Sequence, residues 1–123
     1  MITHIGVWVE DLEASKAFYA TYFAAQAGKK YENTKKAFSS YFLSFPESDV
    51  RLELMHRPDL ASGQETLGFA HIAFSLGSEA AVDALTTRLT HDGYSTTAPR
   101  HTGDGYYEAT VYDREGNLIE LTV

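Results

Sequence analysis

The stretch His71-Ile72-Ala73-Phe74 decides how this chain folds, because it repeats the opening stretch His4-Ile5-Gly6-Val7 after 67 residues. The same interval carries Arg51-Leu52-Glu53-Leu54 onto Leu118-Ile119-Glu120-Leu121, so that in each half a histidine precedes a glutamate by 49 residues. A repeat of this kind indicates one structural unit used twice. We therefore predict a single domain over residues 1–123, built from repeat halves at about 1–60 and 68–123.

The first half is expected to contain a strand, a helix and further strands. Residues 2–9 alternate between apolar and other side chains, as a strand does. Asp11 is suited to cap a helix, whose apolar residues recur at three and four positions and which we expect to end near Gly28. Residues 29–40 are predicted to be a loop with some strand, and strands follow at 40–45 and 50–55.

The second half follows the same plan. A strand over 68–76 leads to a helix that Ser78 caps and that Asp92-Gly93 ends. After a loop rich in threonine, proline and glycine, residues 106–112 and 118–123 form a hairpin. Two short helices cannot cover both faces of so many strands. Each half is therefore expected to read strand, helix, strand, strand, strand, and one face of the sheet should stay concave and open.

Four side chains that can bind a metal are expected on the open face of this sheet. Side chains alternate along a strand, so each strand has an aliphatic row on one face and a histidine or glutamate on the other. A slip of one residue would bury these polar groups, so the orientation is strongly specified. The four residues are His4, Glu53, His71 and Glu120.

Two neutral imidazoles and two carboxylates suit a divalent transition-metal ion. Any one of these residues alone is more often structural or solvent-exposed, but the matched spacing in both halves favours a shared site. Four protein ligands leave room for two neighbouring oxygens of a substrate. We predict a nickel, cobalt, zinc or manganese ion, and the sequence does not distinguish between them.

The composition excludes several classes of function. The chain has 123 residues and no cysteine, which rules out disulfides and thiolate nucleophiles. Its net charge of -7 argues against a nucleic-acid partner. There is no apolar run of about 18 residues and no secretory signal pattern, so we expect no membrane span and a cytoplasmic protein.

The chain resembles the vicinal oxygen chelate superfamily, and most of all its glyoxalase I branch. The likeness extends over essentially the whole chain. It is carried by the opening His4-Ile5-Gly6-Val7, by Glu53 and His71 in their strands, and by the closing block Asp113-Arg114-Glu115-Gly116-Asn117-Leu118-Ile119-Glu120-Leu121. The resemblance implies an α+β fold in which two βαβββ modules form a half-open, eight-stranded mixed sheet around a metal site. It also implies a small-molecule substrate and a homodimer, and the sequence does not distinguish a metal site within one chain from one built across two chains.

The glyoxalase I resemblance also implies an activity. Enzymes of this branch are metal-dependent lyases that chelate the two oxygens of a hemithioacetal, or of a related 2-oxo compound, and stabilise an enediolate. The position of Glu120 holds the carboxylate that moves the proton between neighbouring carbons, and the position of Glu53 assists. We accordingly take Glu120 and Glu53 as candidate catalytic residues.

The candidate substrate-binding residues are Arg51, Trp8, Arg57 and Tyr106. Glyoxalase I enzymes usually hold glutathione with an arginine and an asparagine at positions where this chain has Trp8 and Arg57. Arg51 could clamp a carboxylate or phosphonate, or it could be a charge partner or a solvent-exposed strand end. Trp8 could line the site or pack in a core or dimer contact. Tyr106 lies beside a glycine-rich loop of the kind that often acts as a lid.

Three other functions remain open from the sequence. Thiol transfer onto an epoxide antibiotic, as in fosfomycin resistance, uses three metal ligands, so a fourth ligand at Glu53 weighs against it. Extradiol dioxygenases use two histidines and one carboxylate and are usually much longer. Bleomycin-sequestering relatives are non-catalytic binding modules and have generally lost the metal ligands that this chain keeps.

Overall fold

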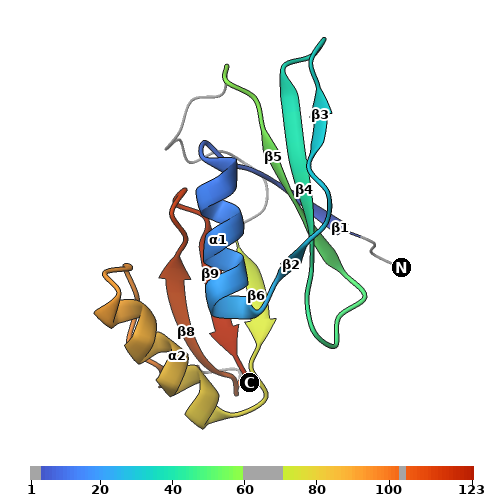
Figure 1. Ribbon diagram of the computed structural model, residues 1–123. Coiled ribbons are helices and arrows are strands. Elements are labelled where there is room, and N and C mark those ends of the chain that lie inside the picture. The colour runs from blue at the N-terminus through green and yellow to red at the C-terminus, as the bar shows by residue number, and fades with distance from the viewer. Residues whose placement is uncertain (1–3, 60–70, 103–104) are drawn as a thin grey trace. The chain divides into compact units, whose positions relative to one another are not determined.

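A computed structural model of the chain describes residues 4–59, 71–102 and 105–123 (Figure 1). The chain divides into two compact units, residues 1–64 and 65–123, and the boundary falls between the predicted repeat halves. The predicted starts of the first strand at Ile2 and of the post-linker strand at Gly68 lie outside the described residues, as do most of the linker and part of the glycine-rich loop.

Unit 1 contains one helix and a mixed sheet. Its elements are β1 (His4–Trp8), α1 (Leu12–Phe23), β2 (Gln26–Ala27), β3 (Tyr31–Asn33), β4 (Phe38–Ser44) and β5 (Arg51–His56). The strands lie in the order β1-β5-β4-β2, with β3 paired to β4 as well. β1 runs parallel to β5, and the other pairs are antiparallel.

Unit 2 has the same plan. Its elements are β6 (Ile72–Ser75), α2 (Glu79–His91), β7 (Arg100–His101), β8 (Tyr107–Tyr112) and β9 (Leu118–Thr122). The order is β6-β9-β8-β7, with β6 parallel to β9. The predicted α+β class and the two βαβββ modules are confirmed. The strands are divided between two mixed sheets, one per unit, and β3 is an additional short strand of unit 1.

The repeat is present in the strand register itself. In unit 1 the parallel pairing places Gly6 opposite Glu53, and in unit 2 it places Ala73 opposite Glu120. A shift of 67 residues converts the first pair into the second. The same shift converts Ile5 and Leu52 into Ile72 and Ile119. The sequence repeat therefore corresponds to a repeated backbone geometry.

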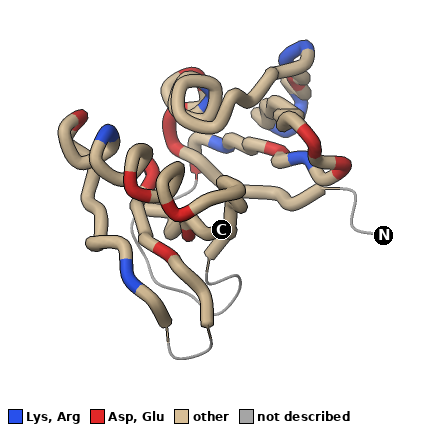
Figure 2. The backbone as a smooth tube through the Cα atoms, turned by 90° about the horizontal axis from the view of Figure 1, so that it is seen from below, with Lys and Arg blue, Asp and Glu red and all other residues tan. Residues whose placement is uncertain are grey.

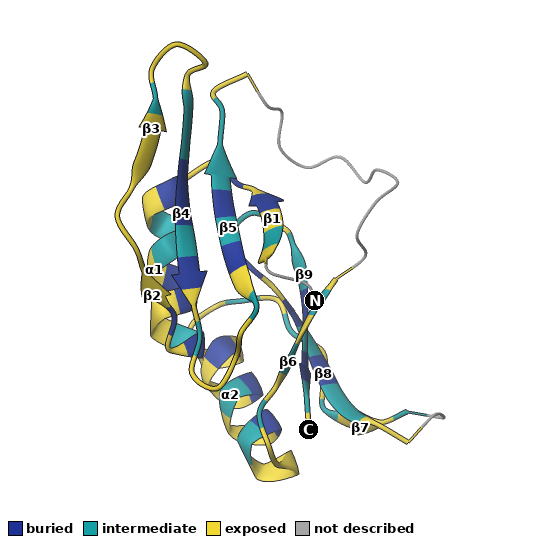
Figure 3. Cartoon of the chain, turned by 90° about the vertical axis from the view of Figure 1, so that its right-hand side faces the viewer, coloured by how far each residue is buried: buried dark blue, intermediate teal, exposed yellow. Residues whose placement is uncertain are grey.

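Each helix covers one face of the sheet in its own unit. α1 packs on β4 and β5, which contain buried stretches (Figure 3). Tyr19 of α1, Leu43 of β4 and Leu54 of β5 are fully buried. α2 packs on β8 and β9, where Leu89 and Ile119 are fully buried. The aliphatic residues of β5 and β9 lie on these buried faces, as predicted, whereas Ile72 and Phe74 of β6 are half-buried. The opposite face of each sheet carries the histidine and the glutamate.

Both predicted helix starts are confirmed. The Asp11 carboxylate accepts a hydrogen bond from the Ala14 amide at 3.0 Å, and the Ser78 hydroxyl accepts one from the Ala81 amide at 3.1 Å. Such caps satisfy amides that have no partner inside the helix.

The predicted end of the first helix near Gly28 is wrong. α1 ends at Phe23, because Ala24 adopts a left-handed conformation with φ 54° and ψ 30°. The chain then pairs with β4, and Gly28 donates its amide to the Phe42 carbonyl at 3.0 Å. Pairing with the sheet therefore ends the helix early. The spacing of apolar residues along the helix contains no information about this pairing.

Neither described helix is long and apolar enough to cross a membrane.

Acidic residues are spread over both units, with lysines and arginines among them (Figure 2).

Candidate metal centre

Unit 2 brings a histidine and a glutamate into direct contact. Glu120 lies in β9 opposite Ala73 of β6, and His71 immediately precedes β6. The His71 Nε2 atom lies 3.2 Å from Glu120 Oε2, and the side chains are 39% and 23% exposed. Two ligands bonded to one ion at about 2.0–2.2 Å lie roughly 3.0–3.5 Å apart. The spacing and the partial exposure of the pair therefore fit two ligands of one divalent ion.

Unit 1 presents the same residue types at equivalent positions. Glu53 lies opposite Gly6, two residues after His4, just as Glu120 lies opposite Ala73, two residues after His71. His4 packs edge-on against the Phe42 ring, with the ring centroids 5.2 Å apart. The Glu53 side chain is half-buried.

Within the residues that the structure describes, no three histidine, aspartate or glutamate side chains gather at one point. Each unit supplies one imidazole and one carboxylate instead. The structure thus brings His71 and Glu120 together and gives His4 and Glu53 the matching register. A site shared by all four residues stays a prediction.

The two positions at which this chain departs from glyoxalase I are in contact with each other. The Arg57 guanidinium carbon lies 4.7 Å from the centre of the Trp8 ring, and Arg57 Nε lies 3.5 Å from an Asp59 carboxylate oxygen. Trp8 is 43% exposed. The tryptophan and arginine therefore form a guanidinium-on-indole pair in unit 1.

The other two candidate substrate-binding residues have different surroundings. Arg51 is paired in register with His4, and its guanidinium carbon lies 4.6 Å from the centre of the Phe42 ring. Tyr106 is exposed in the turn between β7 and β8, where its amide and carbonyl bond to Thr102. No contact links Tyr106 to the His71–Glu120 pair in the described part of unit 2, so its role stays a prediction.

Sequence reasoning missed Phe42 and a polar cluster on unit 2. Phe42 pairs with Glu53 in register, so correct alignment of β4 with β5 would have revealed it. In the polar cluster, Tyr107 donates a hydrogen bond to Asp83, which raises the pKa of Tyr107 to about 12. His101 lies 3.6 Å from Glu79 in the same region. Tyr107 and Asp83 lie far apart in the sequence, and no local pattern links them.

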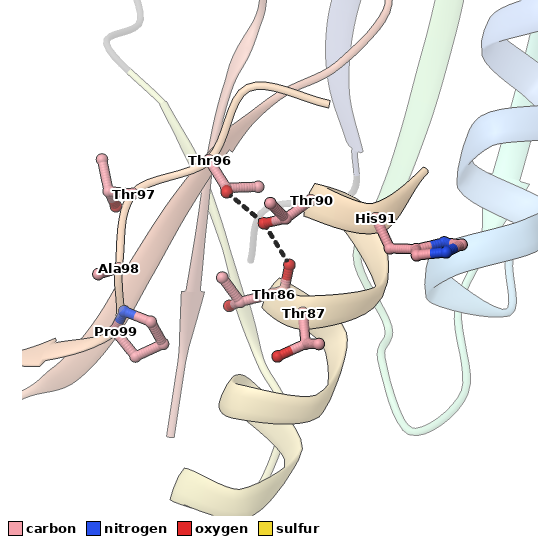
Figure 4. Close-up of a pocket in the computed structure, with 8 residues that line it drawn as sticks. All are labelled: Thr86, Thr87, Thr90, His91, Thr96, Thr97, Ala98 and Pro99. Carbon is pink, nitrogen blue, oxygen red and sulfur yellow. Dashed lines mark hydrogen bonds between the residues drawn. The ribbon is translucent and has the colours of Figure 1, made fainter. Parts of the chain in front are cut away.

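A shallow hollow of unit 2 lies away from these residues. Its lining comes from the second half of α2 and from the segment 96–99 (Figure 4). Thr90 Oγ1 hydrogen-bonds to the Thr86 carbonyl at 2.8 Å and to Thr96 Oγ1 at 2.6 Å. The hydroxyls of Thr90 and Thr96 are thus already hydrogen-bonded within the protein. The hollow contains none of the candidate residues.

Comparison with known proteins identifies the family. The family model of the glyoxalase/bleomycin resistance protein/dioxygenase superfamily matches residues 1–121. The chain belongs to this superfamily. Among known proteins, it is 30% identical to uncharacterized protein PA2024 of Pseudomonas aeruginosa, covering 98% of this chain and 86% of that protein. It is 29% identical to uncharacterized protein YqjT of Bacillus subtilis, covering 96% of this chain and 94% of the relative.

Solved structures show the same fold. A glyoxylase/bleomycin resistance protein/dioxygenase domain from Frankia matches with a TM-score of 0.87 at 17% identity, over 100% of this chain and 96% of that one. Glyoxalase I of Leishmania major matches with a TM-score of 0.80 at 22% identity, over 99% and 85%. A fosfomycin resistance protein of Listeria monocytogenes, solved with Mn(II) and a dihydroxypropylphosphonic acid, matches with a TM-score of 0.75 at 24% identity, over 99% and 90%.

Proposed function

We propose that this protein is a metal-dependent lyase or isomerase of the glyoxalase I type. Its substrate would be a small molecule with two neighbouring oxygens, such as a hemithioacetal or a 2-oxo compound. The observation that carries the proposal is the repeated register, in which Glu53 and Glu120 each lie opposite a residue that follows a histidine by two positions. Superfamily membership supports the same chemistry.

The four proposed ligands are His4, Glu53, His71 and Glu120. A divalent ion held by these residues would supply Lewis acidity to the substrate and so would make a carbon next to the bound oxygens more acidic. The separation of 3.2 Å between His71 and Glu120 supports a common ion for these two residues. Nickel, cobalt, zinc and manganese all accept this set of donors.

Glu120 is proposed to move the proton. Its carboxylate is partly exposed, which supports a role in contact with the substrate. A base in this position takes a proton from one carbon and returns it to the neighbour, which contributes roughly 10²–10⁴ in rate. Glu53 is equivalent to Glu120 by the repeat and is proposed to assist.

Glutathione is not expected to be the thiol. The positions that would hold it carry Trp8 and Arg57, and these two side chains contact each other. We propose a different thiol adduct, or a 2-oxo compound without a thiol. The homodimer and the cytoplasmic location belong to the same proposal, and light scattering of the purified protein tests the homodimer.

The test measures metal content and metal-dependent isomerisation in purified protein. We expect about one divalent ion per chain, and Glu120→Gln or Glu53→Gln should each weaken metal binding by at least about 100-fold, since a ligand matters more than an outer-shell partner. Glu120→Gln should also abolish activity.

The matched control is Glu79→Gln. It removes the carboxylate of another His–Glu pair of unit 2, the one with His101, which lies on α2 outside the proposed site. This variant should keep both metal and activity. The proposal would be overturned if divalent ions changed neither the stability nor the ligand binding of the wild-type protein. That result would favour a non-catalytic binding module.

A further inference from the structure

We propose that Arg51 is a specificity-determining residue that binds an oxyanion on the substrate, a carboxylate or a phosphonate, beside the two oxygens that reach the metal. This inference rests on the proposed function and names the class of its substrate.

The first observation is the position of Arg51. It precedes Glu53 by two residues in β5, so both side chains leave the same face of the strand. Their Cα atoms are therefore about 6.6 Å apart. In register, Arg51 lies opposite His4 of β1. The Arg51 side chain is thus next to His4 and Glu53, the proposed metal ligands of unit 1. A small acid is long enough to contact the metal and Arg51 at the same time.

The second observation is how the guanidinium is held. Its carbon lies 4.6 Å from the centre of the Phe42 ring, and the same ring packs against His4. Stacking on an aromatic face leaves the edge of the guanidinium, with its N–H donors, free to bind. A long side chain fixed in this way loses less entropy when it binds an anion.

The third observation is the absence of a competing anion. Arg51 is exposed, and within the described residues no carboxylate pairs with it. Arg57, by contrast, lies 3.5 Å from Asp59. In a chain of net charge -7, an arginine without an ion pair beside two proposed metal ligands is available to an incoming anion.

Charge balance then selects the ligand. Two carboxylate ligands neutralise a divalent ion, so any further negative charge on the substrate needs another cation. Arg51 supplies one, and its planar fork matches the two oxygens of a carboxylate or a phosphonate. The substrate class that follows is a compact acid with the oxyanion close to its vicinal oxygens.

Three hydroxamates test this inference, because each has the same pair of chelating oxygens. Acetohydroxamate has no further charge, malonomonohydroxamate adds a carboxylate, and phosphonoacetohydroxamate adds a phosphonate. Binding to the metal-loaded protein can be followed by the fluorescence of Trp8, which is the one tryptophan of the chain.

We expect at least one of the charged hydroxamates to bind about tenfold or more tightly than acetohydroxamate, as a charge-assisted hydrogen bond would provide. The better of the two identifies the oxyanion. Arg51→Gln should remove this preference, and it should weaken the binding of acetohydroxamate, which chelates as a monoanion, by a smaller factor. Arg114→Gln removes an exposed arginine from the turn before β9 and should keep the preference.

Two results would overturn the inference in different ways. Equal affinity for all three hydroxamates, or a preference that survives Arg51→Gln, would overturn the anion site and leave the proposed metal chemistry intact. Failure to take up a divalent ion, with no hydroxamate bound, would overturn the proposed function and this inference with it.

Discussion

Trp8 is the one tryptophan of the chain, so the fluorescence of the protein reports on its surroundings. The Arg57 guanidinium carbon lies 4.7 Å from the centre of the Trp8 ring. We expect Arg57→Gln to lower the free energy of unfolding by about 0.5–1 kcal/mol, the usual contribution of a partly exposed cation–π pair. The tryptophan emission should change as well. Urea unfolding followed by fluorescence measures both, with Arg114→Gln as the control. If neither quantity changes, the pair does not persist in solution.

Tyr107 makes a second prediction at the residue scale. The hydrogen bond to Asp83 favours the neutral phenol and raises the pKa of Tyr107 to about 12. Because the folded-state pKa is raised, the associated stability is present below about pH 10 and is lost as the pH rises through 12. Absorbance at the phenolate band during an alkaline titration should show one late tyrosine.

Asp83→Asn should return that tyrosine toward its ordinary pKa of about 10. Glu79→Gln is the matched control, since Glu79 is the smallest contributor to the shift and acts only through its charge. If the absorbance of Asp83→Asn still shows one tyrosine that ionises late in the alkaline titration, the high pKa belongs to another tyrosine.

At the level of whole elements, the caps decide where the helices begin. Asp11 accepts the Ala14 amide at the start of α1, so Asp11→Ala should cost about 1 kcal/mol of stability. Asp11→Asn keeps an oxygen in the same place and should cost much less. Denaturant unfolding of the two variants measures the difference, and equal losses would show that the carboxylate acts through its charge rather than as a cap.

The elements also show what the sequence can and cannot predict. Alternation of apolar residues predicted the buried faces of β5 and β9, where Leu52, Leu54, Ile119 and Leu121 are buried. The caps at Asp11 and Ser78 were predicted as well, since a cap is a local arrangement. The end of α1 was not, because Ala24 turns the chain to pair with β4, which is distant in sequence.

The same distinction applies to the site. The repeat predicted the positions of His71 and Glu120, and the structure places them 3.2 Å apart. The stacking of Arg51 on Phe42 and of Arg57 on Trp8 depends on which residues face each other across strands. That information comes from the alignment of one strand against another and from side-chain conformation, and no spacing along the chain contains it.

For the whole molecule, the central proposal is that one divalent ion is bound by two imidazoles and two carboxylates, His4, His71, Glu53 and Glu120. X-ray absorption spectroscopy of the protein loaded with zinc or cobalt tests this claim most directly. We predict two histidine nitrogens per ion at about 2.0–2.1 Å, with oxygen ligands completing the shell. A spectrum with one imidazole, as the His71–Glu120 pair alone would give, or with none, would contradict it.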